Sequence, residues 1–227
     1  MAKVTKTSQE EQRQQNLAEA VSKSEQFFNK NGNLIFGILI GVLVIAFGVL
    51  GYKYFFQGPK EERAAEDMRQ ATEWFNTGEY ELALNGDDND LGFADILDKY
   101  GSSAGEAVYM YTGICRLHTG AYEDAIDNLK KYNGSEANLL SRAQACIGDA
   151  YVELEDYESA ISYFEKAAKT VDSPLAASYL LKAGIAAEAD GEPQKALEFY
   201  KTIKDKWEQS PEASEIDKYI TRIETAE

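Results

Sequence analysis

Residues 144–151, QACIGDAY, and residues 155–160, EDYESA, decide the fold, because versions of this pair of segments occur three times in the chain. The other copies are 109–114 with 120–125, and 180–184 with 191–196. Small residues recur at intervals of 35 and 36 positions in both segments: Gly113, Gly148 and Gly184 in the first, Ala125, Ala160 and Ala196 in the second. A period of this length is typical of a solenoid of repeated helix pairs.

The residue types at these positions have a physical reason. Two antiparallel helices approach closely only where a small side chain lies at their crossing, so we expect the glycine and the alanine of each unit to face each other. Larger residues one turn further along, Leu129, Phe164 and Tyr200, are expected to fill the space between neighbouring units. No unit can bury its apolar face alone, which makes stacking obligatory.

This pattern resembles the tetratricopeptide repeat family, and the resemblance implies a right-handed superhelix of helix-turn-helix units. The expected units are 61–100, 106–140, 141–174 and 177–210, with a capping helix within 211–227 that carries Ile216, Tyr219, Ile220 and Ile223. The first unit is weaker, and residues 85–92 are expected to interrupt its second helix. The predicted class is all-α.

A second feature is the apolar run at residues 34–56. Leu34 to Gly51 contains no charge, and thirteen of these eighteen residues are Leu, Ile, Val or Phe. As a helix, 23 residues rise about 34 Å, which matches a hydrocarbon core of about 30 Å. Because 33 mostly polar residues precede the run and bulky aromatics end it, we expect an uncleaved transmembrane helix and not a signal peptide.

The tail at residues 1–33 is predicted to be a marginal helix. It begins with a capping-box pattern at 7–10, carries Leu17, Val21 and Phe28 on one stripe, and meets a helix-breaking signal at 31–33. A solvated tether and a docking helix both fit this segment.

Charge is unevenly distributed along the chain. Residues 1–33 carry five Lys or Arg against four Glu, whereas residues 57–227 carry 17 against 35 Asp or Glu. A domain this acidic repels phosphate backbones, so nucleic acid is excluded as a partner. The number of Lys and Arg residues beside the span does not favour the tail as the cytoplasmic side. An N-terminal tail without a signal peptide is, however, most simply retained in the cytoplasm. We therefore expect the N-terminus in the cytoplasm and the repeat domain in the periplasm.

Two surfaces are candidate partner sites. Small residues at spacings of four, three, four and three form a helix-packing seam in the membrane: Gly37, Gly41, Val44, Gly48 and Gly51. Frequent glycine in membrane helices explains the same pattern. The resemblance implies a peptide or partner groove lined by first-helix positions: Met110, Ile114, Leu117, Arg142, Ala145, Asp149, Val152, Leu181, Ile185 and Glu188. This groove is mostly apolar, which suits an apolar polypeptide segment. Coverage by the chain's own terminal helix is the alternative.

No pattern indicates catalysis, a metal, a cofactor or a small-molecule substrate. Residues 101–105, GSSAG, match a hydrolase motif that requires a preceding strand, but a helix is expected there. The acidic loop 87–90 misses the spacing of a calcium loop. Cys115 and Cys146 have no zinc-site or redox spacing and are expected in the core, with a disulfide as the alternative in an oxidising compartment.

The whole order of tail, span and acidic repeats resembles the membrane-anchored tetratricopeptide proteins of Gram-negative envelopes, which include an ancillary subunit of the Sec translocon. The resemblance implies a non-enzymatic protein of the bacterial inner membrane that holds or chaperones envelope proteins beside a translocon-like complex. Two alternatives stay open: a scaffold or assembly factor for another inner-membrane complex, and an enzyme or regulatory sensor.

Overall fold

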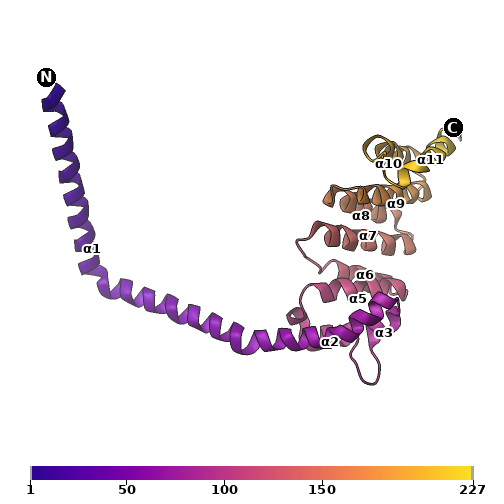
Figure 1. Ribbon diagram of the computed structural model, residues 1–227, viewed down its shortest axis with the longest axis horizontal. Coiled ribbons are helices and arrows are strands. Elements are labelled where there is room, and N and C mark those ends of the chain that lie inside the picture. Colours follow the sequence, from indigo (N-terminus) through magenta and orange to yellow (C-terminus); the bar gives the residue numbers. More distant parts are fainter. Residues whose placement is uncertain (1, 226–227) are drawn as a thin grey trace. The chain divides into compact units, whose positions relative to one another are not determined.

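The structure is a computed structural model that describes residues 2–225; within 2–28 it describes only the side chains of Ser22 and Phe27. The regular secondary structure of the described chain is all helical, apart from one isolated bridge between Gly86 and Leu91. It forms two compact units, Met1–Gly58 and Pro59–Glu227. The first is the long helix and the second is the repeat domain (Figure 1).

Helix α1 extends over Ala2–Tyr52 without interruption, so the predicted break at 31–33 is wrong. Gly and Asn each cost a helix about 1 kcal/mol or less relative to Ala, and such a cost does not end a helix that is already propagated on both sides. Asn31 also stays within the helical pattern by donating from Nδ2 to the Phe27 carbonyl at 3.1 Å. The predicted capping box at 7–10 and the stripe of Leu17, Val21 and Phe28 fall outside the side chains that the structure describes.

The apolar part of this helix is unburied. Phe47 and Ile45, at its centre, are 71% and 68% exposed. Within the described residues, one continuous helical stretch, Asn29–Thr77, contains a segment long and apolar enough to cross a membrane, and none of that segment is buried. An exposed apolar surface of this length requires either lipid or another protein to cover it.

A single wide turn follows the apolar segment. Lys53–Gln57 is a π-helix, closed by a hydrogen bond from the Gly58 N–H to the Lys53 carbonyl. Pro59 has no N–H, and in an α-helix its ring would clash with the carbonyl of Phe55. The wider π turn is the usual way for a helix to accommodate such a position. Gly58 and Pro59 therefore widen the helix without ending it, and α2 begins at Gly58.

The repeat domain consists of paired helices that stack in chain order (Figure 1). Its α-helices are α2 (Gly58–Thr77), α3 (Tyr80–Asn85), α4 (Phe93–Tyr100), α5 (Ala107–His118), α6 (Tyr122–Leu129), α7 (Ala137–Glu153), α8 (Tyr157–Thr170), α9 (Leu175–Ala189), α10 (Pro193–Lys206) and α11 (Ile216–Glu224). Short 3-10 turns lie at Gly101–Ala104 and Glu212–Ser214. The boundary expected between 140 and 141 falls inside α7, because the loop between the two units ends earlier.

The periodic glycines lie at the helix crossings. A Cβ added to Gly148 of α7 would lie 2.6 Å from Cε1 of Phe164 on α8, and one added to Gly113 of α5 would lie 2.5 Å from Cγ of Leu129 on α6. Gly184 of α9 faces the Tyr200 ring of α10 in the same way. The larger residues expected between units therefore pack first against the glycine of their own helix pair.

The interruption expected at 85–92 is present. Helix α3 ends at Asn85, α4 begins at Phe93, and the Gly86–Leu91 bridge closes the loop between them. Asp87 Oδ1 accepts hydrogen bonds from the backbone N–H groups of Asn89 and Asp90, both at 2.8 Å. The Asp87 side chain thus stabilises a tight turn.

The buried residues of the repeat domain form three core clusters along the stack, and α11 closes the C-terminal one. Ile216, Ile220 and Ile223 of α11 are buried in the same cluster as Phe164 of α8 and Tyr200 of α10. An amphipathic last helix is what a solenoid needs, because it covers the apolar face of the final pair and presents a polar face to water. The helix starts at Ile216 and is preceded by the 3-10 turn, five residues after Pro211.

Candidate functional site

The ten predicted groove residues lie on the first helices α5, α7 and α9, but they do not share one accessible surface. Met110, Ile114 and Ala145 are only 6%, 2% and 4% exposed. The first two pack in the cluster that joins α5, α6 and α7, and Ala145 packs in the C-terminal cluster. These three residues are corrected from groove-lining to core positions, since the neighbouring helices approach too closely to leave their side chains accessible.

The remaining apolar groove residues are more accessible. Leu117, Val152 and Leu181 are half-buried against the core clusters. Ile185 of α9 is 47% exposed, which is the highest value among the large apolar side chains that the structure describes in the repeat domain. Arg142 of α7 is exposed. Among the predicted groove residues, the most accessible apolar side chain is therefore Ile185, toward the C-terminal end of α9.

A cavity of about 160 Å³ lies at these helix ends. Three predicted groove residues line it together with five others that sequence reasoning missed: Asp149, Val152 and Ile185, with Tyr157, Phe164, Lys182, Ala186 and Ala189. An apolar protein cavity of about 150 Å³ is large enough to hold a benzene molecule. This cavity, which we call the inner cavity, therefore has room for one aromatic or branched aliphatic side chain.

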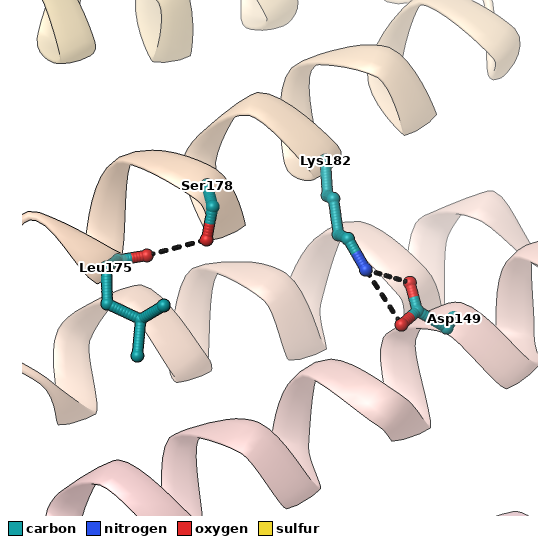
Figure 2. Close-up of polar contacts among 4 residues, drawn as sticks. All are labelled: Asp149, Leu175, Ser178 and Lys182. Carbon is teal, nitrogen blue, oxygen red and sulfur yellow. Dashed lines mark hydrogen bonds and ion pairs between the residues drawn. The ribbon is translucent and has the colours of Figure 1, made fainter. Parts of the chain in front are cut away.

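One wall of the inner cavity is an ion pair between two helices. Lys182 Nζ of α9 lies 2.8 Å from both Oδ1 and Oδ2 of Asp149 on α7, as Figure 2 shows. The same ammonium lies 5.7 Å from the centroid of the Phe164 ring, which forms part of the cavity floor. Since its charge is already matched by a carboxylate, Lys182 is poorly suited to bind the carboxylate of a ligand.

Glu188, the last predicted groove residue, is covered by the terminal helix. Its Oε1 accepts hydrogen bonds from the Tyr200 hydroxyl and from Arg222 Nη2 of α11, both at 2.6 Å. Burial, together with the hydrogen bond to Glu188, strongly raises the pKa of the Tyr200 hydroxyl. For this residue the alternative of coverage by the chain's own terminal helix is correct.

A second, larger hollow is lined by α8, α9 and the end of α10 and was missed by the sequence analysis. Its volume is about 540 Å³. We call it the outer groove; it is lined by Glu165, Ala168, Lys169, Val171 and Asp172 of α8 and the turn after it, Ala176 and Leu180 of α9, and Phe199, Thr202, Lys206 and Trp207 at the end of α10. The available signal was Trp207, a large aromatic residue just beyond the repeat pattern.

The residues of the predicted membrane seam lie in helix α1. A Cβ added to Gly37, Gly41, Gly48 or Gly51 would meet nothing within 4 Å. Val44, on the same seam, is 65% exposed. The described chain thus leaves this side of α1 open to a partner helix or to lipid.

The hydrolase-like residues at 101–105 do not form a nucleophile elbow. Helix α4 precedes them, and Gly101–Ala104 forms a 3-10 turn, so no strand presents Ser103 on a strained turn. His118 ends α5, where its ring stacks on Tyr80 with centroids 3.9 Å apart. This histidine is used in packing between α3 and α5.

The described residues also bear on metal binding and on the reactivity of the two cysteines. Among the described residues, no group of three or more His, Cys, Asp or Glu side chains could hold a metal ion. Cys115 and Cys146 are free thiols. Burial raises the pKa of Cys115 to about 12 and that of Cys146 to about 11, which lowers the thiolate fraction of both.

Comparison with known proteins identifies the repeats that build the inner cavity. Residues 147–211, from the middle of α7 to the end of the last helix pair, match the tetratricopeptide repeat family. Within this stretch the chain is similar to tetratricopeptide repeats. The stretch contains every residue that lines the inner cavity and the outer groove. Tetratricopeptide repeats are protein–protein interaction modules, so both surfaces lie in the part of the chain suited to bind a protein partner.

One solved structure has a similar helical repeat fold. The crystal structure of MamA protein is 20% identical, covers 71% of this chain and 90% of its own, and has a TM-score of 0.51. A second crystal structure of MamA is also 20% identical, covers 68% and 92%, and has a TM-score of 0.49. At this identity the likeness concerns the helical repeat fold alone. A comparison with curated protein sequences gives no significant match.

Proposed function

We propose that this protein is a membrane-anchored tetratricopeptide interaction protein that holds apolar segments of envelope proteins beside a translocon-like complex of the inner membrane. It has no catalytic role in this proposal. The observation that carries it is the inner cavity, an apolar hollow of about 160 Å³ on the first-helix face of a tetratricopeptide repeat. Its one cation, Lys182, is already paired, so an apolar side chain is the suitable guest.

The anchor in this proposal is the apolar helix at 34–56. Its exposed Leu, Ile, Val and Phe side chains would be covered by lipid, with Tyr52, Tyr54, Phe55 and Phe56 at the headgroup level. The N-terminal tail would be cytoplasmic and the repeat domain periplasmic. Resistance to alkaline carbonate extraction, together with digestion of the repeat domain by protease in spheroplasts but not in intact cells, is the expected result. Carbonate release of the intact chain contradicts the anchor, and protection in spheroplasts contradicts the orientation.

Photo-crosslinking in intact cells tests what the cavity holds. A crosslinking amino acid at Ile185 is expected to capture a set of envelope polypeptides, and one at Gly41 to capture a membrane subunit through the seam. Leu175 provides the matched control, because it lies at the other end of α9 (Figure 2), is 41% exposed and lines neither hollow. Equal adducts from Ile185 and Leu175 would count against holding in the cavity.

A scaffold function is the second candidate, and the outer groove favours it. The outer groove has a volume of about 540 Å³, two aromatic residues and a charged rim. Its size and composition are closer to those of a protein–protein interface than to those of a pocket for a single side chain. A scaffold that binds no client predicts that Phe199→Glu releases a complex from the membrane fraction, whereas Ile185→Glu leaves the cells unaffected. The holding function predicts an envelope defect from Ile185→Glu.

A further inference from the structure

We infer that the segment held in the inner cavity is a cationic one: a single aromatic or branched aliphatic side chain flanked by Lys or Arg. This inference rests on the proposed function and adds the chemistry of the partner. The apolar part follows from the cavity floor and walls, where Val152, Phe164 and Ile185 leave room for about one ring. The cationic part follows from the charges that surround the cavity mouth.

Two acidic turns border the mouth. The first lies at the junction of α7 and α8, where Glu153 ends α7, Glu155 and Asp156 lie between the helices, and Glu158 lies in the first turn of α8. The second follows α9 and contains Asp190 and Glu192. No Lys or Arg lies between Arg142 and Lys166, or between Lys182 and Lys195. Two helices of the cavity wall therefore end in turns whose charged side chains are all negative.

Three of these carboxylates are already engaged, beginning with Glu153, whose Oε2 accepts a hydrogen bond from the Tyr122 hydroxyl at 3.1 Å. Glu192 pairs with Lys195 at 3.0 Å, and Asp156 Oδ1 caps α8 by accepting from the Ser159 N–H at 3.1 Å. Glu155, Glu158 and Asp190 are exposed. The C-termini of α7 and α9 lie beside the N-termini of α8 and α10, and their opposite partial charges offset each other, so the negative field at the mouth comes from the side chains.

Glu155 stands out among the available carboxylates. Its φ is 59°, the only positive value at a described non-glycine residue. The corresponding turns of the other helix pairs place Gly78, Gly120 and Gly191 at φ of 80–82°. Glycine is the low-energy residue for this conformation, so the turn beside the cavity carries a charge at a conformational cost. Such an outlier agrees with a role in binding.

The ion pair on the cavity wall excludes a preference for acidic segments. An acidic segment would need a free cation, and Lys182 is held at 2.8 Å by both oxygens of Asp149. A segment flanked by Glu or Asp would also meet the two acidic turns. Repulsion by several exposed carboxylates then selects against acidic partners.

The test uses full-length protein in detergent micelles and four fluorescent nonapeptides that differ only at defined positions. Three carry a central Phe with flanks of two Lys, two Ser or two Glu on each side, and the fourth replaces the Phe of the Lys-flanked peptide by Ala. We expect the Lys-flanked Phe peptide to bind about tenfold tighter than the Ser-flanked one, and the Glu-flanked one weakest. Because exposed charges are screened beyond about 3 Å at 1 M salt, this preference should largely vanish there.

Matched variants assign the binding to the inner cavity. Ile185→Arg should abolish binding of both the Lys- and Ser-flanked peptides, whereas Leu175→Arg on the same helix should leave binding unchanged. Glu155→Gly should weaken the Lys-flanked peptide by about threefold, leave the Ser-flanked peptide unchanged and raise the unfolding midpoint of the protein. Asp95→Asn, a charge change of equal size on α4, should have no effect on binding.

The outcomes separate the inference from the function on which it rests. Equal binding of all three Phe peptides, blocked by Ile185→Arg, would overturn the charge preference and leave the apolar holding function intact. No binding of any Phe peptide would overturn both. Equal binding of the Phe and Ala versions of the Lys-flanked peptide would show general attraction to an acidic protein and would also overturn the inference.

Discussion

Gly148 of α7 lies directly against the ring of Phe164 on α8, where a Cβ on the glycine would be 2.6 Å from Cε1. Phe164 is only 1% exposed, so its ring has little space into which to move. Gly148→Ala gains about 1 kcal/mol of helix propensity but overpacks the crossing, which typically costs about 1–3 kcal/mol. We expect a net loss of about 1 kcal/mol in the free energy of unfolding, measured by urea denaturation. Ser162→Ala, at an exposed position of α8, is the control; stabilisation by Gly148→Ala would contradict the crossing.

The terminal helix is held by apolar burial more than by charge. Ile216 is 0% exposed, and Ile216→Ala should cost about 2–4 kcal/mol. Arg222 pairs with Glu188, but its side chain is 58% exposed, so Arg222→Ala should cost less than about 1 kcal/mol. Hydrogen exchange of α11 amides measures both effects. A larger loss of protection from the arginine variant would reverse this ranking.

Glu155→Gly should stabilise the protein by up to about 1 kcal/mol. The left-handed conformation at φ 59° costs a residue with a side chain about 1–2 kcal/mol, whereas glycine adopts it freely. Part of this gain is lost because glycine gains more entropy on unfolding. Thermal unfolding of the full chain measures the gain. Glu158→Gly, in the first turn of α8, should instead destabilise the protein by about 1 kcal/mol. Destabilisation by both changes would show that Glu155 makes contacts that outweigh its backbone strain.

Asp67 should make stability depend on pH in the acidic range. Hydrogen bonds from the Tyr100 hydroxyl at 2.7 Å and from Lys99 Nζ at 2.9 Å hold the pKa of Asp67 below its usual value of 3.8. A lowered folded-state pKa means that this contribution is present above pH 3.8 and is lost as pH falls through the folded-state pKa. Asp67→Asn should therefore be less stable than the natural protein at pH 6, and the difference should shrink below pH 3.8. A difference independent of pH would contradict the role of the charged carboxylate.

The two cysteines should react slowly in the folded protein. At pH 8 a thiol of pKa about 11, as burial gives Cys146, has about 100-fold less thiolate than one with the ordinary pKa of 9.0. Reaction with a thiol reagent should accelerate to the rate of a free thiol in denaturant. Cys115, with a pKa of about 12, should react no faster than Cys146. Rapid labelling of the folded protein would show that α5 and α7 open locally.

The sequence by itself determined the helix pairs, because the spacing of Gly113, Gly148 and Gly184 follows from the need for a small residue at every crossing. It also located the interrupted second helix at 85–92 and the apolar face of the last helix. It failed at 31–33, where local glycine and asparagine preferences lost to propagation of an existing helix. Sequence alone likewise placed the apolar segment long enough to cross a membrane, since length and composition are local properties.

Only the tertiary structure decided which first-helix side chains remain accessible. Met110 and Ile185 belong to the same predicted groove, yet one is buried between helices and the other borders a cavity, because the distance between neighbouring helices depends on every side chain packed between them. The pairing of Lys182 with Asp149, 33 positions apart, and the left-handed turn at Glu155 were decided in the same way. The repeat period fixes where helices cross, whereas the packing of particular side chains fixes what they leave open.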